Sequence, residues 1–331
     1  MISLDKKILD PSSSVARRMI EYGKTDELFI LVPAPEKNQF DLSATVHVAT
    51  TGGRKLQQLW RLRGLGIDSI KTQKHKNTKT LFISTQDPFF IGFVGLFIKQ
   101  QTGVPLEVQL HGDFYSSDYY RQSGLKNWFQ YHLGKRVIAR ADRVRVVGER
   151  VRESVIRLGV LPEKIVVRPV AVDTKRIEEQ APAFDLHKKY AEFKKIFLAL
   201  GRLEVVKNLA WLIRFWGDVV AKEPRFLLLI VGSGGERQTI EGLVKKLNLC
   251  HNIIFEPWTT DPWSYLKTAD ALLFPSISEG YGLVVREAIA AGLPVIMNDV
   301  GVANYEVPAS DQATIVPIND AGAWQAAIHK I

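Results

Sequence analysis

Two carboxylates, Glu279 and Glu287, flank the start of a predicted helix within residues 276–288. Gly280 and Gly282 leave the backbone N–H groups at this helix start open to close approach, and the positive end of the helix dipole faces whatever binds there. Such a helix start favours an anion. Because an ionised carboxylate only accepts hydrogen bonds, Glu279 beside an anion site indicates a ligand that also carries hydroxyl groups, such as a sugar.

Glu287 lies one helical turn from apolar residues only, namely Leu283, Val284, Ala290 and Ala291. Burying an unpaired carboxylate is costly, so we expect this side chain either to pair with a distant cation or to accept hydrogen bonds from a hydroxylated ligand. Simpler interpretations stay open at this point. Glu279 would also be a favourable charge near a helix N-terminus, and Glu287 would also fit a half-exposed helix position.

Arg202 and Lys207 lie between a predicted strand end and a predicted helix start, where cations oppose the helix dipole unless an anion is present. A diphosphate would supply that anion, with Arg202 as a bidentate donor and Lys207 as a point charge. Together they could neutralise charge on a leaving nucleoside diphosphate. The alternative is a pair of solvated loop cations.

Three further features are weaker signals of chemistry. The turn at Gly232 and Gly234 partly matches a dinucleotide-binding fingerprint, but Arg237 replaces its third glycine, so a plain or nucleotide-facing turn fits better. His111 ends a predicted strand and could donate a hydrogen bond to a sugar hydroxyl, although a lone histidine is more often structural. Asp113 could orient His111 or an acceptor hydroxyl.

Composition narrows the class of protein. The chain has 331 residues, 46% of them apolar, which is enough for two ordinary domains. One cysteine excludes a disulfide framework and a cysteine-rich metal site, and it fits a reducing cytoplasm. No Asp-x-Asp motif is present, so we predict no metal site and no cofactor.

The net charge of +9 lies entirely in the first half of the chain. Residues 1–180 carry 29 Lys or Arg against 19 Asp or Glu, while residues 181–331 carry 15 against 16. This asymmetry indicates an acidic partner for the first half, such as lipid headgroups. No recognition motif supports nucleic-acid binding.

A helix expected at residues 127–141 carries Trp128, Phe129 and Tyr131 among lysines and arginines. It could lie in peripheral contact with an anionic membrane, at the inner face of the membrane if the protein is cytoplasmic. The more ordinary interpretation is a core-facing aromatic stripe with a solvated basic face.

Short apolar runs alternate with helical patterns along the chain, which predicts parallel βαβ units. Strands are expected at residues 27–33, 80–84, 105–110, 143–147 and 164–169, then again at 195–200, 225–231, 252–255, 270–275, 294–297 and 314–316. We therefore predict an α/β protein of two Rossmann-like, doubly wound parallel-sheet domains facing a cleft, at residues 1–177 and 178–331.

The motifs together resemble the retaining glycosyltransferases of family four, which have the GT-B fold. Residues 279–288, followed by Ala291-Gly292-Leu293-Pro294, resemble their E-x7-E signature. Residues 201–203 with Lys207 and Asn208 resemble their diphosphate motif, and residues 111–113 their short histidine motif. The three motifs occur in the expected order and span nearly the whole chain.

This resemblance implies roles for individual residues. Glu279 would hold the sugar hydroxyls, Glu287 the ribose, and Arg202 and Lys207 the diphosphate. His111 would serve catalysis on the acceptor side, beside Asp113. The remaining donor contacts would come from Gly201, Gly280, Tyr281, Gly282 and Leu283. Trp258, which stands where the family has a glycine-containing turn, would stack on the base.

The chain departs from the family in three places. Ser12-Ser13-Ser14 stands where a Gly-Gly loop is usual, and Pro257-Trp258 replaces a glycine-containing turn. Relatives also continue with a final helix that crosses back to the first domain, so we expect this crossover helix to be missing and the chain to be a fragment.

The resemblance predicts a cytoplasmic enzyme that moves a sugar, with retention and without metal, from a nucleoside-diphosphate sugar to a hydroxyl acceptor. This acceptor would be a glycan, a lipid-linked molecule or a small molecule. The alternatives are a GT-B sugar-nucleotide epimerase and a nucleotide-sugar-binding protein without catalysis.

Overall fold

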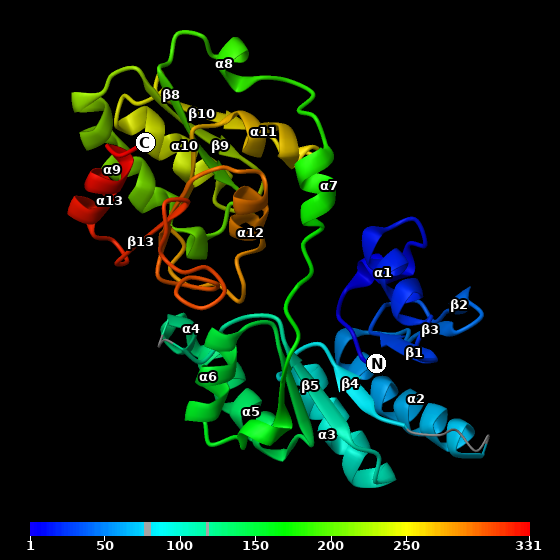
Figure 1. Ribbon diagram of the computed structural model, residues 1–331. Coiled ribbons are helices and arrows are strands. Elements are labelled where there is room, and N and C mark those ends of the chain that lie inside the picture. Colours follow the sequence, from blue (N-terminus) through cyan, green and yellow to red (C-terminus); the bar gives the residue numbers. More distant parts are fainter. Residues whose placement is uncertain (76–80, 117–118) are drawn as a thin grey trace. The chain divides into compact units, whose positions relative to one another are not determined.

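The computed structural model describes residues 1–75, 81–116 and 119–331 (Figure 1). The chain divides into two compact units. Unit 1 comprises residues 1–147 and 151–168, and unit 2 comprises residues 148–150 and 169–331. The predicted boundary between residues 177 and 178 falls inside helix α7 (Thr174–Glu179) of unit 2.

Unit 1 contains a mixed three-stranded sheet and a parallel four-stranded sheet. The first has the order β1-β3-β2 and the second the order β4-β5-β6-β7. Ile2 forms parallel bridges to both Leu31 of β1 and Thr85 of β4, so the first residues of the chain join the two sheets. The strands are β1 (Leu28–Val32), β2 (Gln39–Ser43), β3 (Val46–Thr50), β4 (Ile83–Thr85), β5 (Leu106–Leu110), β6 (Arg143–Val146) and β7 (Ile165–Val167).

Helices cover these sheets because apolar residues recur at helical spacing between the strands. They are α1 (Ser14–Tyr22), α2 (Lys55–His75), α3 (Phe90–Thr102), α4 (Tyr119–Gln122), α5 (Leu125–Arg140) and α6 (Glu149–Arg157), with 3-10 turns η1 (Lys6–Leu9) and η2 (Pro162–Lys164). All five residues of β5 are buried, as expected for a central parallel strand.

Unit 2 is built on one parallel six-stranded sheet in the order β10-β9-β8-β11-β12-β13. The order reverses between β8 and β11, which makes this pair the topological switch point of the sheet. The strands are β8 (Lys195–Leu200), β9 (Phe226–Val231), β10 (Ile253–Glu256), β11 (Ala271–Phe274), β12 (Val295–Asn298) and β13 (Ala313–Val316).

The remaining elements of unit 2 pack on this sheet or follow its strands. They are α7, α8 (Leu186–Lys189), η3 (Val205–Lys207), α9 (Leu209–Lys222), α10 (Arg237–Lys246), α11 (Pro262–Thr268), α12 (Leu283–Ala290) and α13 (Ala321–Ile328). Figure 1 shows α9 and α13 next to each other. Trp216 and Trp324 are fully buried in the core that these two helices share with the sheet.

The predicted α/β fold with parallel sheets is confirmed, and most predicted elements lie within a few residues of the observed ones. Three details were wrong. The hairpin of β2 and β3 was not predicted. The sequence also predicts a basic helix at residues 55–65, which extends to His75, and a linker at residues 178–185, whose first residues belong to α7. The predicted strand at 80–84 is observed as Ile83–Thr85, and its residue 80 lies outside the described residues.

The glycines at 232 and 234 serve close backbone packing between the loops that follow β8 and β9. A Cβ on Gly232 would lie 1.9 Å from the carbonyl oxygen of Gly201, and one on Gly234 would lie 2.2 Å from that of Leu203. The Leu203 N–H donates to the Ser233 carbonyl at 2.9 Å. These two glycines therefore belong to a turn that supports the loop after β8.

Replacing Gly232 with alanine should lower the stability of unit 2. The backbone of Gly201 would have to move, and Gly232 itself has a φ of +149°, which L side chains rarely adopt. We expect a loss of about 2 kcal/mol or more, measured as a fall in Tm. Gly235→Ala is the matched control, because a Cβ there meets nothing within 4 Å. An equal Tm for both variants would contradict this account.

Candidate functional site

The loops that follow β8 and β11 lie together at the switch point of the unit 2 sheet. The Ile277 N–H donates to the Val206 carbonyl at 3.0 Å, and the Asn208 side-chain amide donates to the Pro275 carbonyl at 3.2 Å. Ligands of doubly wound sheets bind at the carboxyl ends of the strands next to such a reversal. The predicted diphosphate loop and the predicted sugar loop are thus neighbours, as the site requires.

Lys207 and Glu279 form an ion pair across these two loops, with Nζ of the lysine donating to Oε1 of the glutamate. Their side chains are only 18% and 14% exposed. The Ser276 hydroxyl donates to the same carboxylate oxygen at 3.0 Å, and the Lys207 ammonium lies 5.1 Å from the ring centroid of Phe274. The structure thus brings two predicted site residues from different loops into direct contact.

Arg202 lies on the loop of Lys207 but has a different partner. Its Nη1 lies 2.5 Å from Oε1 of Glu204, and its side chain is 75% exposed. An exposed ion pair of this kind contributes little to stability, so an anionic ligand can take the guanidinium at small cost. The two predicted diphosphate cations therefore differ, because Lys207 is held in a largely buried ion pair and Arg202 in an exposed one.

The helix start predicted from Gly280 and Gly282 is α12. Gly282 is its N-cap residue with a φ of +93°, and no side chain caps the first N–H groups. The preceding residue, Tyr281, is buried and accepts a hydrogen bond from the Val302 N–H at 2.8 Å. The hydrogen bond from Val302 therefore holds the backbone just before α12, and the uncapped N-terminus of this helix presents the positive end of its dipole.

Glu287 lies on α12 and is partly buried. Burial raises the pKa of its carboxyl group above the ordinary value. Within the described part of the chain, this carboxylate has no hydrogen-bond or ion-pair partner. A partly desolvated acceptor without a donor is the feature that a hydroxylated ligand would satisfy.

Trp258 lies just beyond the end of β10, and its side chain is 65% exposed. The strand end is anchored by Glu256, whose carboxylate accepts from Lys189 Nζ at 2.7 Å and from the Tyr190 hydroxyl at 2.5 Å, and also from the Tyr265 hydroxyl. An exposed indole on an anchored strand end is available for stacking on a planar ligand.

The predicted acceptor residues His111 and Asp113 follow β5 in unit 1. His111 lies at the surface of unit 1 with its ring partly buried, and its Nε2 lies 3.2 Å from the side-chain oxygen of Gln109. Desolvation and the positive charges of Arg145 and Arg18 lower its pKa, which favours the neutral imidazole. Asp113 is buried and accepts from the Ser116 N–H at 3.0 Å.

Sequence reasoning missed three residues of the switch point. Ser276 donates a hydrogen bond to Glu279. Asn208, in the loop after β8, donates one to Pro275 in the loop after β11, and the ring of Phe274 lies beside Lys207. Ser276 and Asn208 were both in the stretches singled out. However, the contact of Asn208 with Pro275 joins segments 67 residues apart, and the contact of Ser276 with Glu279 depends on how the loop between them folds. Only the strand order brings those segments together.

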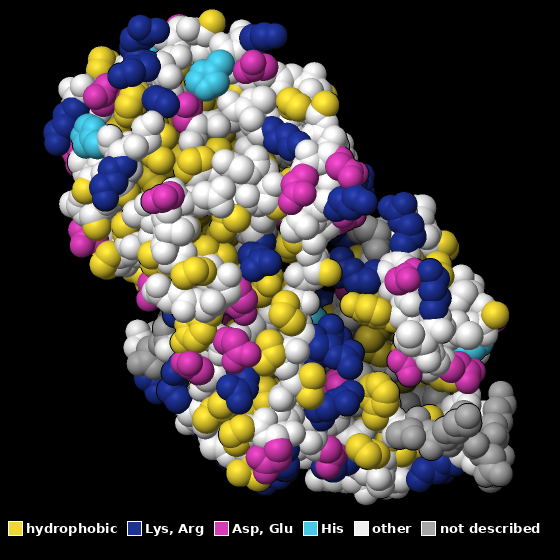
Figure 2. Space-filling model, viewed as in Figure 1, with side chains coloured by type: hydrophobic (Ala, Val, Ile, Leu, Met, Phe, Trp, Pro, Cys, Tyr) yellow, Lys and Arg dark blue, Asp and Glu magenta, His cyan; other side chains and the backbone are white. Residues whose placement is uncertain are grey.

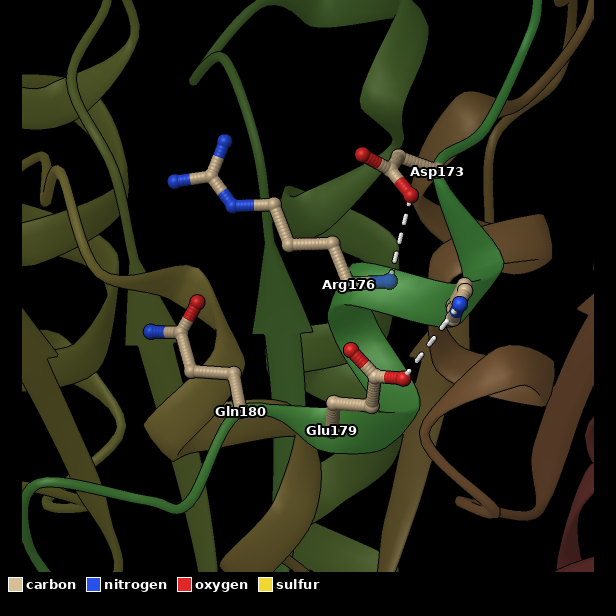
Figure 3. A pocket seen from close by; sticks show the side chains of 5 residues that line it. Asp173, Arg176, Glu179 and Gln180 are labelled. Carbon is tan, nitrogen blue, oxygen red and sulfur yellow. Dashed lines mark hydrogen bonds and ion pairs between the residues drawn. The ribbon is translucent and has the colours of Figure 1, made fainter.

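The described residues include no group of three or more His, Cys, Asp or Glu side chains that could hold a metal ion. Within the same residues, no helix is both long enough and apolar enough to cross a bilayer. A hollow of about 510 Å³ lies along α7, where Figure 3 shows Arg176 and Gln180 extending to the same side. Asp173 caps this short helix, and none of the predicted site residues lines the hollow.

Comparison with protein families identifies the two halves of the chain. Residues 184–331 match the model described as glycosyl transferases group 1, and residues 16–171 match the model described as glycosyl transferase 4-like domain. The chain belongs to this family of glycosyltransferases, and its fold is GT-B, the class of two Rossmann-like domains.

Individual relatives agree with this assignment. An uncharacterized glycosyltransferase of Haemophilus influenzae is 36% identical over 102 residues, which are 31% of this chain and 29% of the relative. Alpha-monoglucosyldiacylglycerol synthase of Streptococcus pneumoniae is 25% identical over 224 residues, covering 65% of this chain and 51% of the relative. The matches thus span from three tenths to half of these relatives.

A solved structure, Anabaena HepE in complex with UDP-glucose, shares the fold. Its TM-score is 0.73 at 17% sequence identity, with 99% of this chain and 88% of that chain covered. At this identity the likeness concerns the fold, so the chemistry has to be argued from the residues themselves.

Breaking the buried ion pair should destabilise unit 2. Lys207→Met leaves the Glu279 carboxylate desolvated beside Ser276 alone, which should cost about 2 kcal/mol. The double variant Lys207→Met/Glu279→Gln should recover part of this loss, because neither charge is then unpaired. Thermal unfolding measures both effects. Arg202→Met is the control on the same loop, with an expected change within about 0.5 kcal/mol; a loss as large as that of Lys207→Met would refute the distinction.

Replacing Glu287 should raise stability in a pH-dependent way. Because burial raises its folded pKa above the unfolded value, the ionised carboxylate opposes folding at pH values above the folded pKa. Glu287→Gln should therefore increase Tm at pH 8, and the gain should shrink as the pH falls through the folded pKa towards the unfolded value. Glu178→Gln, at an exposed position of α7, is the control without such a trend. A gain independent of pH would point to a different cause.

Proposed function

We propose that the protein is a retaining glycosyltransferase that moves a sugar from a nucleoside-diphosphate sugar to a hydroxyl acceptor without a metal ion. The observation that carries the proposal is the junction of Lys207 and Glu279 at the switch point of unit 2, next to the uncapped start of α12. It combines a cation for phosphate, a carboxylate for hydroxyls and a helix N-terminus for negative charge.

In this proposal the donor lies along the carboxyl edge of the unit 2 sheet. Arg202 and Lys207 hold the diphosphate, Glu287 accepts hydrogen bonds from the ribose hydroxyls, and Trp258 stacks on the base. Glu279 accepts from sugar hydroxyls, while the backbone of Gly201, Gly280, Tyr281, Gly282 and Leu283 lines the sugar and phosphates. That HepE was solved with UDP-glucose supports this class of donor.

The reaction breaks the bond between the anomeric carbon and the diphosphate oxygen, and forms a bond from that carbon to the acceptor oxygen. The acceptor proton passes to the departing phosphate on the same face of the sugar, so the configuration is retained. Arg202 and Lys207 stabilise the charge that develops on the leaving group. On the acceptor side we assign His111, in its neutral form, to a hydrogen bond with the acceptor, and Asp113 to its orientation.

The acceptor in this proposal carries a hydroxyl group on a glycan or a lipid-linked molecule. The relative named alpha-monoglucosyldiacylglycerol synthase and the strongly basic first half of the chain support a lipid-linked acceptor. The single cysteine, Cys250, supports a reducing cytoplasm as the place of action.

Two ligands distinguish the proposed contact of Arg202 with the diphosphate from that of Glu287 with the ribose, because inorganic diphosphate has no ribose. Arg202→Ala should weaken both nucleoside diphosphate and inorganic diphosphate at least about tenfold, because it removes a charge-assisted hydrogen bond. Glu287→Ala should weaken the nucleoside diphosphate alone. Isothermal titration calorimetry measures both, with Arg214→Ala on the exposed side of α9 as the control. The roles are wrong if both variants bind nucleoside diphosphate like the parent.

Turnover distinguishes the proposal from its alternatives. A panel of nucleotide sugars with lipid and glycan acceptors should give a product with the donor's anomeric configuration by NMR, at the same rate with and without EDTA. An isomerised sugar formed in the absence of acceptor would indicate an epimerase. Tight nucleotide binding with no turnover across the panel would indicate a binding protein.

A further inference from the structure

Three helices of unit 1 turn large apolar side chains toward solvent. Among the described residues, fifteen large hydrophobic side chains are exposed, and six of them lie on α2, α3 and α5. These six, which we call the aromatic face, are Trp60 on α2, Phe90 and Phe93 on α3, and Leu125, Trp128 and Phe129 on α5. The helix at 127–141 is therefore no core-facing aromatic stripe, because Trp128 and Phe129 are about half exposed.

The aromatic face extends over three helices that pack on one another. α3 packs against both α2 and α5, and the rings of Phe90 and Phe129 are 6.5 Å apart between centroids. On the other side of α3, the Arg63 guanidinium lies 3.7 Å from the ring centroid of Phe97 and 5.5 Å from that of Trp60. An apolar-lined hollow of about 470 Å³ opens beside Trp128 and Phe129.

Cations surround this face and acids are scarce. Lys or Arg occurs five times in α2, once in α3 and four times in α5, against Asp68 as the one acidic residue of the three helices. Lys126, Lys135 and Arg136 are exposed on α5 next to the aromatic residues. Figure 2 shows hydrophobic and Lys or Arg side chains side by side on the visible surface of unit 1.

We propose that the aromatic face and its cations dock the protein on an anionic lipid bilayer. Tryptophan and phenylalanine gain free energy at the headgroup level of a bilayer, and lysine and arginine keep their charges at the lipid phosphates while their stems cover apolar surface. Exposed apolar residues at i, i+3 and i+4 with a basic border are the pattern of a helix that lies in the membrane interface. The proposal goes beyond the sugar transfer and does not depend on it.

Two other occupants fit the face less well. A second copy of the chain would bring the same cations against one another, which opposes association. A single-stranded nucleic acid would use the cations and stack its bases on the rings. However, the most exposed residue of the face is Leu125, at 89%, which offers no stacking surface but inserts readily among acyl chains.

Vesicle co-sedimentation tests the proposal. The parent should bind vesicles of phosphatidylcholine with phosphatidylglycerol, bind vesicles of phosphatidylcholine alone weakly, and lose binding as salt is added. Trp128→Ser/Phe129→Ser should lower the partition coefficient at least about tenfold through lost apolar contact. Lys135→Glu/Arg136→Glu should lower it by a similar factor through lost attraction to the surface.

The controls change the same residue types elsewhere. Lys245→Glu/Lys246→Glu makes the same charge change on exposed α10 of unit 2, and Leu161→Ser removes an exposed apolar side chain of unit 1; both should bind vesicles like the parent. Unchanged Tm and circular dichroism confirm that the variants fold.

Three outcomes overturn the proposal. The first is that the parent does not bind anionic vesicles, or that all four variants bind like it. The second is that the parent sediments as a dimer in the analytical ultracentrifuge and Trp128→Ser/Phe129→Ser as a monomer, which makes the face an interface between copies. The third is that an oligonucleotide, and not the vesicles, binds through these residues.

Discussion

The ion pair between Lys207 and Glu279 is the interaction on which the arrangement of the site depends. Both side chains are largely removed from water, so each charge is tolerated only while the other stays close. The pair therefore fixes the distance between the loop after β8 and the loop after β11. A second set of hydrogen bonds supports it, because the Pro275 carbonyl accepts from the side-chain amides of both Asn208 and Asn298.

The hydrogen bonds that support the ion pair continue into the core of unit 2. Asn298 is fully buried at the end of β12 and accepts a hydrogen bond from the Trp324 indole at 3.1 Å. Trp324 in turn packs among the aromatic side chains of α9. In the proposed reaction, an incoming diphosphate competes with Glu279 for Lys207, which would free the carboxylate to accept from the sugar. Binding and positioning of the donor would then be coupled through one lysine.

The sequence predicted the fold well where the pattern was local. Buried strands such as β5 and β9 are short apolar runs between turns, and they are found within about a residue of their expected ends. It failed at β2, whose polar residues pair with β3 across a tight turn and leave no apolar run to detect. It also failed at α2, whose end was predicted at residue 65 although the helix continues to His75.

The site was predictable as a set of residues but not as a set of contacts. Glu279, Lys207 and Glu287 were each recognised from their own neighbours along the chain. That Lys207 would pair with Glu279, and Arg202 with Glu204, depends on the strand order and on how far each side chain is buried. Neither quantity is encoded in spacing along the sequence, so the two cations looked equivalent until the loops were placed.

For α5, too, the sequence predicted which residues share a face but not what that face contacts. A spacing of three and four residues says that Leu125, Trp128 and Phe129 share one face of α5, but not whether that face points to the core or to solvent. The missing acids were the better signal, since a water-facing helix side ordinarily mixes both signs of charge and α5 carries lysine and arginine alone. A surface that is apolar and basic together is stable in water only at a cost, and an anionic interface removes that cost for both kinds of side chain at once.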